Sequence, residues 1–266
     1  LYNKSPVFLD PYDDYKYTNG NWWIGGNSGA GKSVTLQCLA GRLREQGKRV
    51  VCVIPKKGHE FRPNCEQLGG LYLRLSPSSR DCPNIMAIRR RTLDAYAGIQ
   101  EWAARDDSVL ADKISRLIIW YSLQKKDLTE EDKNYLDASL VECYDRYGIT
   151  FDNASVVDEN GAFKEMPIIP DWYNVLLEKA ETKHLAVVLT RYVNGSAAAM
   201  GRRNHISIDN KYIVLDTSGM PDDLILPGIY WAIDVANDII MNAGGELSAL
   251  IADELWSLVG AGSNPL

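Results

Sequence analysis

The chain has 266 residues and a net charge of −6 at pH 7, with 45% hydrophobic and 24% charged residues. This composition is ordinary for a globular protein, and no run approaches the roughly 20 apolar residues that a membrane span needs. The acidic balance excludes a global basic field, so possible DNA contact would depend on local clusters such as residues 89–91 or 202–203. The five scattered cysteines contain no C-x-x-C pair, which argues against a disulfide framework and a zinc site.

The first predicted elements are a strand, a glycine-rich loop and a helix. Residues 22–25 contain Trp-Trp-Ile, as a buried strand would, and residues 32–46 have helical spacing of apolar residues up to Gly47. Between them, residues 26–33 read Gly-Asn-Ser-Gly-Ala-Gly-Lys-Ser, a complete G-x-x-x-x-G-K-[ST] phosphate-binding loop. Strand, loop and helix in this order are the context that the motif requires.

This loop supplies most of the candidate nucleotide-binding residues. They are Gly26, Asn27, Ser28, Gly29, Ala30, Gly31, Lys32, Ser33 and Val34. The glycines allow backbone N–H groups to surround phosphates, and the helix N-terminus adds partial positive charge. We expect Lys32 to contact the β- and γ-phosphates of ATP as a catalytic residue, and the Ser33 hydroxyl to be a ligand of Mg²⁺.

The next part of the chain predicts further α/β structure and then a change of pattern. Strands are predicted over residues 49–54 and 71–75, whereas amphipathic helical spacing begins at about residue 93. One helix is predicted over residues 107–125. The next helices begin at a capping box at Thr129 and at Pro170. We therefore predict a mostly helical inserted subdomain over residues 93–182, which supplies no phosphate ligand.

The α/β pattern is expected to return after this insert, from about Leu185. Residues 205–208 and 212–215 are predicted to form a hairpin around an Asp-Asn turn, followed by a helix over residues 227–241. The predicted fold class is α/β, a P-loop RecA-like ATPase core with a mostly parallel sheet and an inserted α-helical subdomain. The core is discontinuous. Its two parts are residues 1–92 and 183–266.

The last predicted strand carries a second nucleotide motif. Residues 247–252 are an apolar run that ends in Asp253 and Glu254, the Walker B pattern of a buried strand followed by carboxylates. We expect Asp253 to hold Mg²⁺ and Glu254 to polarise the attacking water as a catalytic general base. Because an Asp alone can serve metal binding, the added Glu favours hydrolysis of ATP over phosphoryl transfer to another substrate.

Several segments together resemble one family, the C-terminal ATPase domain of VirB4 proteins of type IV secretion and conjugation. Besides the P-loop, these segments are Asn-Gly-Asn at 19–21, Lys-Gly-His-Glu-Phe-Arg at 57–62 with Cys65 and Leu-Gly-Gly at 68–70, Cys-Pro-Asn-Ile-Met at 82–86, Tyr-Ile-Val-Leu-Asp-Thr-Ser-Gly at 212–219, and Asp-Glu-Leu-Trp at 253–256. The Lys-Gly-His-Glu-Phe segment resembles a Gram-positive variant. One departure is Pro-Lys-Lys at 55–57, where many relatives have an acidic residue.

The resemblance implies an ATP-hydrolysing motor that uses ATP and Mg²⁺ and works with other type IV secretion components. It implies a homo-oligomeric ring, a hexamer when full length, that is cytoplasmic and peripherally associated with the cell membrane through the secretion complex. The chain starts without Met and is expected to be a fragment with no transmembrane segment. The family's arginine-bearing segment would follow Leu266, so we expect the fragment to be largely monomeric and a poor ATPase.

Two other functions share these motifs. A DNA translocase or coupling protein of the FtsK, HerA or VirD4 type has the same core, and salt-dependent DNA binding would favour it, although the acidic balance favours secretion. A nucleotide-gated assembly scaffold with negligible turnover is the second alternative, against which Glu254 argues.

A few further residues have open roles. Trp22 and Trp23 could stack on adenine or fill the core, and Asp216 could face the γ-phosphate or form a turn. Glu60 is a candidate secondary site residue, and Arg202 and Arg203 could supply a catalytic arginine or be ordinary surface charge.

Overall fold

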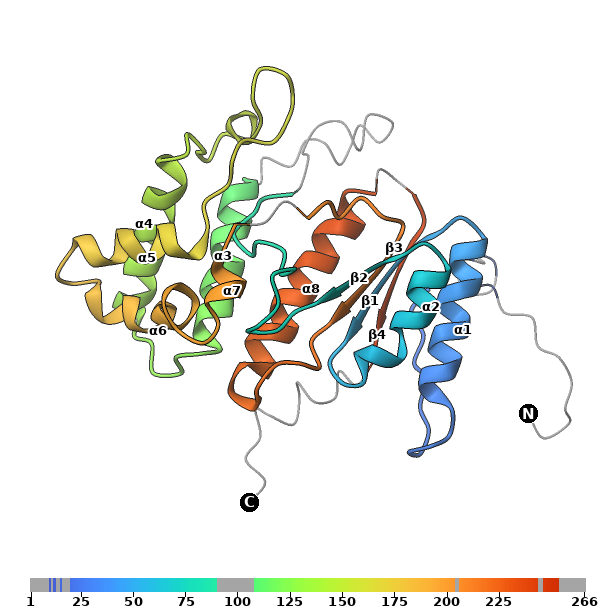
Figure 1. Ribbon diagram of the computed structural model, residues 1–266. Coiled ribbons are helices and arrows are strands. Elements are labelled where there is room, and N and C mark those ends of the chain that lie inside the picture. The colour runs from blue at the N-terminus through green and yellow to red at the C-terminus, as the bar shows by residue number, and fades with distance from the viewer. Residues whose placement is uncertain are drawn as a thin grey trace, which may run out of the picture.

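The sheet of this protein has four parallel strands. The computed structural model describes residues 10, 12, 15, 20–89, 108–203, 206–243 and 246–253. The strands are β1 (Arg49–Ile54), β2 (Leu71–Arg74), β3 (Tyr212–Asp216) and β4 (Ser248–Ala252), in the spatial order β2-β3-β1-β4. All three pairings are parallel, so the carboxyl ends of the strands meet at one edge of the sheet (Figure 1).

β1 lies inside the sheet, and its sequence explains why. Five of its six residues, Val50 to Ile54, are buried, and they are almost entirely β-branched. Such runs are typical of parallel strands, which are covered on both faces. Val53 lies opposite Leu215 on β3 and opposite Ala252 on β4. This register places the end of β1 between Asp216 and Asp253.

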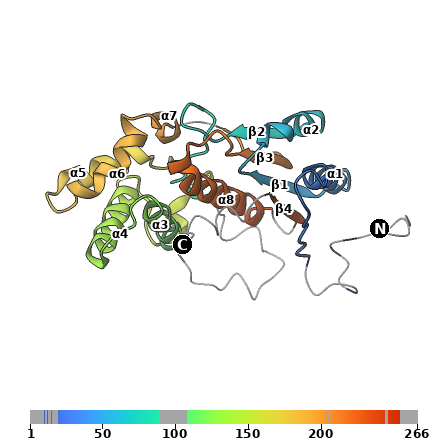
Figure 2. The same cartoon turned by 90° about the horizontal axis from the view of Figure 1, so that it is seen from below.

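Helices cover both faces of the sheet. One face packs against α1 (Lys32–Glu45) and α2 (Arg62–Gln67) through a small apolar cluster that includes Leu43, Phe61 and Cys52. The other face packs against α8 (Ile225–Met241), as Figure 2 shows from a second direction. The short 3₁₀ turns η1 (Gly58–Glu60) and η3 (Asp222–Leu224) precede α2 and α8.

Five helices form a group beside α8, on the side away from α1 (Figure 1). They are α3 (Val109–Ser122), α4 (Glu130–Asp145), α5 (Ile169–Glu178), α6 (Lys183–Val193) and α7 (Ala198–Gly201), with the 3₁₀ turn η2 (Asn153–Val156) between α4 and α5. A single apolar cluster extends from the sheet through α8 into these helices. The helical group and the sheet therefore share one hydrophobic core.

Several predicted elements are confirmed. The helix after the P-loop, the strands at 49–54 and 71–75, the two helices after residue 107 and the helix that ends at Met241 all occur within a few residues of their predicted bounds. The capping box at Thr129 is present, because its hydroxyl accepts the N–H of Asp132, whose carboxylate accepts the N–H of Thr129. These elements depend on local signals.

Two strand predictions were wrong. Residues 22–25 form no strand, and Trp23 is 87% exposed. Residues 206–210 form no strand either, because β3 pairs in parallel with β1 and β2 and therefore belongs to no hairpin. The helical region continues through α6 and α7 to Gly201, beyond the expected boundary at 182. Both strand predictions were made without the pairing partners that decide strand formation.

The connection between β2 and the helical group is an extended strap, residues 82–89. Its carbonyl oxygens accept hydrogen bonds from side chains of three helices. Trp231 of α8 donates to Pro83 at 2.8 Å, Lys113 of α3 donates to Ile85 at 3.3 Å, and Tyr144 of α4 donates to Met86. A buried segment without secondary structure needs such partners, and here they fix the strap to both halves of the fold.

A buried ionic cluster joins α3 to α8. Lys113 Nζ lies 2.8 Å from Asp234 Oδ2 and 3.5 Å from Asp238 Oδ2, and Arg116 contacts both carboxylates, at 2.9 Å from Asp238 Oδ1. Lys113 and Asp238 are fully buried. Burial alone would raise the pKa of Asp238, but the neighbouring cations Lys113, Arg116 and Arg89 hold it below its usual value.

The stretch Asp222–Met241, which contains α8, is long and apolar enough to cross a membrane by length and composition. It differs from the prediction that no run of the sequence approaches the length of a membrane span. In the fold it is the central helix, with 61% of the apolar window buried, and it packs on β1 and β4. The core helix of a globular domain meets the same length and composition criteria.

Candidate nucleotide-binding site

The P-loop has the backbone conformation that its glycines permit. Gly29 and Gly31 have φ values of +78° and +85°, in the left-handed region that side chains disfavour. The Ala30 N–H donates to Asn27 O at 3.2 Å and closes a turn. Gly31 then caps α1, whose first turn contains no acidic residue. The N-terminus of α1 therefore keeps its partial positive charge for an anion.

Lys32 lies over this loop. Its Nζ donates to Gly26 O at 2.8 Å and to Asn27 O at 3.0 Å, and the residue is half-buried. The amine is thus held by the first two residues of the motif. An ammonium group at this position faces the same loop whose backbone would surround phosphates.

Ser33 and Asp253 meet although 220 positions separate them in the sequence. Ser33 Oγ lies 3.4 Å from Asp253 Oδ2, where the start of α1 approaches the end of β4. The Asp253 N–H donates to Val53 O at 3.2 Å, which fixes the carboxylate beside the end of β1. A hydroxyl and a carboxylate are hard oxygen donors of the kind that Mg²⁺ prefers together with phosphate and water. The side chains present therefore fit this cation.

Glu254, the predicted general base, lies outside the described residues. Within the described part of the chain, no group of three or more His, Cys, Asp or Glu side chains could hold a metal ion by itself.

Asp216 occupies the same edge of the sheet but on the far side of β1. Its Oδ1 accepts the Ser218 N–H at 2.8 Å, and its Oδ2 accepts the Tyr72 hydroxyl. Burial, followed by the contact with Asp216, raises the pKa of Tyr72. Of the two roles that the sequence left open, the structure shows the turn. The Tyr72 partner could not be found from the sequence, because it comes from a neighbouring strand.

Gly58 packs directly against this carboxylate, which allows a test. A Cβ atom at Gly58 would lie 2.0 Å from Asp216 Oδ1, so we expect Gly58→Ala to displace the carboxylate and to lower the free energy of unfolding by about 1–3 kcal/mol. Gly41→Ala is the control, because it meets only ordinary contacts within α1 and should stabilise the helix. Urea denaturation of both variants measures the difference. Equal stability of Gly58→Ala and the wild type would contradict the close packing.

Other candidates have different surroundings. Trp22 is 37% exposed, so neither it nor Trp23 fills the core. Arg203 is fixed by Met166 O at 2.8 Å and by Glu165 at 2.9 Å, far along the chain from the P-loop. Through these contacts Arg203 anchors the segment after α7 to the segment that precedes α5. The ionic cluster between α3 and α8 was not predicted from the sequence. A usable signal was the pair of Asp residues four positions apart on the apolar helix α8.

Comparison with known proteins supports the assignment made from the motifs. No family model matches the chain, and no curated protein sequence matches it. Among solved structures, "Structure of VirB4 of Thermoanaerobacter pseudethanolicus" superposes with a TM-score of 0.68 and 26% sequence identity, covering 85% of this chain and 82% of that one. The fold, an α/β P-loop domain with a parallel sheet, is shared over most of both chains. The match confirms the resemblance to the VirB4 family that the sequence motifs indicated.

Proposed function

We propose that this chain is the ATP-hydrolysing motor domain of a type IV secretion or conjugative DNA-transfer apparatus. The strongest support is that the P-loop lies beside the end of the Walker B strand. Ser33 Oγ is 3.4 Å from Asp253 Oδ2. Two motifs far apart in the sequence thus form one site at the carboxyl edge of a parallel sheet, where open α/β folds bind ligands. The similarity to VirB4 supports the biological setting.

Each residue of the site has a proposed task. The P-loop backbone and the N-terminus of α1 bind the phosphates, and Lys32 balances the charge of the β- and γ-phosphates. Ser33 and Asp253 hold Mg²⁺, which neutralises phosphate charge when it is bound. Glu254 orients a water molecule and accepts its proton. Hydrolysis is favoured because Glu254 directly follows the metal-binding Asp253.

The assembly and location of the domain are further proposals. By its similarity to VirB4, we propose that the full-length protein forms a ring of identical subunits with other secretion components at the cytoplasmic face of the membrane. The helical group α3 to α7 is proposed as a subdomain that supplies no phosphate ligand. In support, the contact between Ser33 and Asp253 joins the start of α1 to the end of β4 and involves none of these helices.

Lys32→Ala tests nucleotide binding. We expect it to weaken ATP binding at least tenfold, about 1.4 kcal/mol, because no other lysine lies in the loop. Isothermal titration calorimetry with Mg·ATP measures the affinity, and circular dichroism checks the fold. Lys126→Ala is the matched control, since Lys126 is exposed in the loop between α3 and α4. Unchanged affinity of a folded Lys32→Ala protein would refute the nucleotide site.

A further inference from the structure

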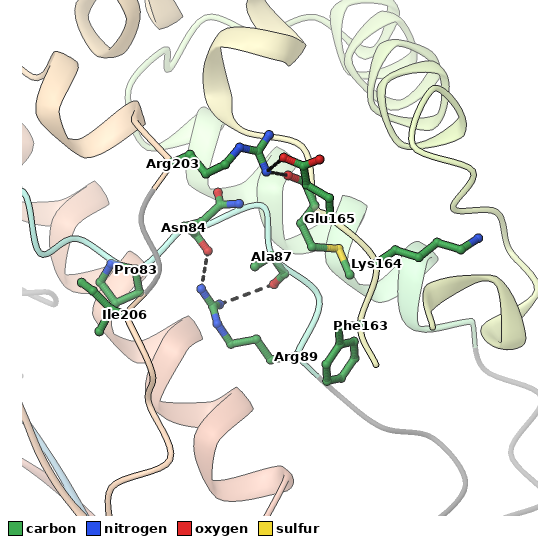
Figure 3. A pocket seen from close by; sticks show the side chains of 10 residues that line it. Pro83, Asn84, Ala87, Arg89, Phe163, Lys164, Glu165, Arg203 and Ile206 are labelled. Atoms are coloured by element: carbon green, nitrogen blue, oxygen red, sulfur yellow. Dashed lines mark hydrogen bonds and ion pairs between the residues drawn. The ribbon is translucent and has the colours of Figure 1, made fainter. Parts of the chain in front are cut away.

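A cavity lies next to the strap, at the helical side of the fold. It has a volume of about 360 Å³ and is bounded by the strap, by residues 163–166 and by the segment around Arg203 and Ile206 (Figure 3). This volume lies in the range of small-ligand and side-chain pockets. No residue of the nucleotide site lines it.

The lining combines an apolar wall with cationic groups. Pro83, Ala87, Phe163, Met166 and Ile206 form the apolar part. An apolar wall of this kind has little to offer a bare inorganic anion but suits an aliphatic or aromatic group. The ligand should therefore carry an apolar body.

The charged groups of the lining are mostly positive. Arg89, Lys164 and Arg203 line the cavity together with one carboxylate, Glu165, but Lys164 points away from it and its Nζ donates to Gly148 O at 2.8 Å. Figure 3 shows Arg203 paired with Glu165, and Arg89 directed at Asn84 and Ala87. Because Glu165 balances Arg203, the remaining positive charge at the cavity is that of Arg89. It favours an anionic group on the ligand.

Arg89 has little compensation for its charge among the described residues. Its side chain is only 14% exposed, and its Nη1 lies 3.8 Å from the carboxylate of Asp238. That carboxylate is already shared with Lys113 and Arg116 at shorter distances. Its guanidinium also donates to the carbonyl oxygens of Asn84 and Ala87. Burial lowers the pKa of Arg89, in keeping with a cation that lacks a close counterion.

We propose that this cavity binds a carboxylate borne on an apolar segment of a partner polypeptide, with Arg89 and Arg203 as the anion-binding groups. Such a ligand would place its carboxylate between the guanidinium groups and an apolar side chain against Phe163 and Met166. A nucleic acid fits less well, because Glu165 lies in the wall and the chain is acidic overall. The site is separate from the nucleotide site and does not depend on ATP hydrolysis.

Calorimetric titration of the whole chain with short peptides tests this proposal. Acetyl-Leu-Leu-Glu-amide carries a side-chain carboxylate, and acetyl-Leu-Leu-Leu with a free carboxyl terminus carries a terminal one. Comparing the two peptides shows which kind of carboxylate the cavity binds. We expect one of them to bind, and its uncharged amide analogue to bind at least about tenfold more weakly. Lys32→Ala should leave this binding unchanged, which separates it from the proposed ATPase function.

Two variants locate the binding. Ala87→Leu fills the cavity without removing a cation and should weaken the peptide at least about tenfold. Ala111→Leu, on the exposed face of α3, is the matched control and should have no effect. The proposal is overturned if neither peptide binds at millimolar concentration, if the amide analogue binds equally well, or if Ala87→Leu binds like the wild type. Tighter binding of inorganic phosphate or of a thymidine oligonucleotide than of both peptides would also overturn it.

Discussion

Asp238→Asn should lower the free energy of unfolding by about 3–5 kcal/mol, the usual cost of removing one partner from a buried ion pair. Asp238 is fully buried, and its carboxylate contacts Lys113 and Arg116, with Arg89 at 3.8 Å. The amide has the same shape but no charge, so Lys113 and Arg116 would share Asp234, and Arg89 would lose the carboxylate nearest to it. The loss should therefore far exceed that of a surface substitution.

Urea denaturation followed by circular dichroism measures this effect. Asp127→Asn is the control, because Asp127 is 81% exposed and pairs only at the surface with Lys125, so its loss should stay within about 1 kcal/mol. The double variant Asp238→Asn with Arg89→Gln removes one unpaired cation. Its loss of unfolding free energy should therefore be smaller than the sum of the losses of the two single variants. A loss for Asp238→Asn no larger than that for Asp127→Asn would show that the cluster contributes little to stability.

Glu254→Gln should bind Mg·ATP as well as the wild type but lose hydrolysis by about a hundredfold or more, the scale of a positioned general base. The amide keeps the shape of the side chain but cannot accept a proton from water. The prediction is based on the Walker B motif, in which Glu254 follows the metal-binding Asp253. Steady-state release of phosphate by the full-length protein measures the rate.

Two controls make this result specific. Calorimetry must show intact nucleotide binding, since a loss of binding would point to misfolding rather than to a missing base. Glu159→Gln, in an exposed turn of the helical group, should hydrolyse ATP at the wild-type rate. Wild-type turnover by Glu254→Gln would assign the proton transfer to another group.

The sequence by itself determined the features that depend on near neighbours in the chain. The P-loop glycines at 29 and 31 require left-handed backbone, and both have it. The capping box of Thr129 and Asp132 fixes the start of α4, because donor and acceptor are three residues apart. β1 was predictable because a run of buried β-branched residues suits a strand covered on both faces. Spacing within one segment was sufficient for each of these predictions.

Tertiary structure decided what depends on distant partners. Tyr212 to Asp216 is an ordinary strand by pattern, but only its parallel pairing with β1 and β2 excludes the predicted hairpin. Trp22 to Ile24 has the composition of a strand and forms none, since strand propensity requires a neighbour to pair with. The approach of Ser33 to Asp253 and the cluster of Lys113 with Asp238 join residues more than a hundred positions apart. The first contact is set by the parallel pairing of β4 with β1, and the second by the packing of α3 on α8. The spacing of Asp234 and Asp238 indicates two carboxylates on one face of a helix, but only the packing brings their cationic partners to them.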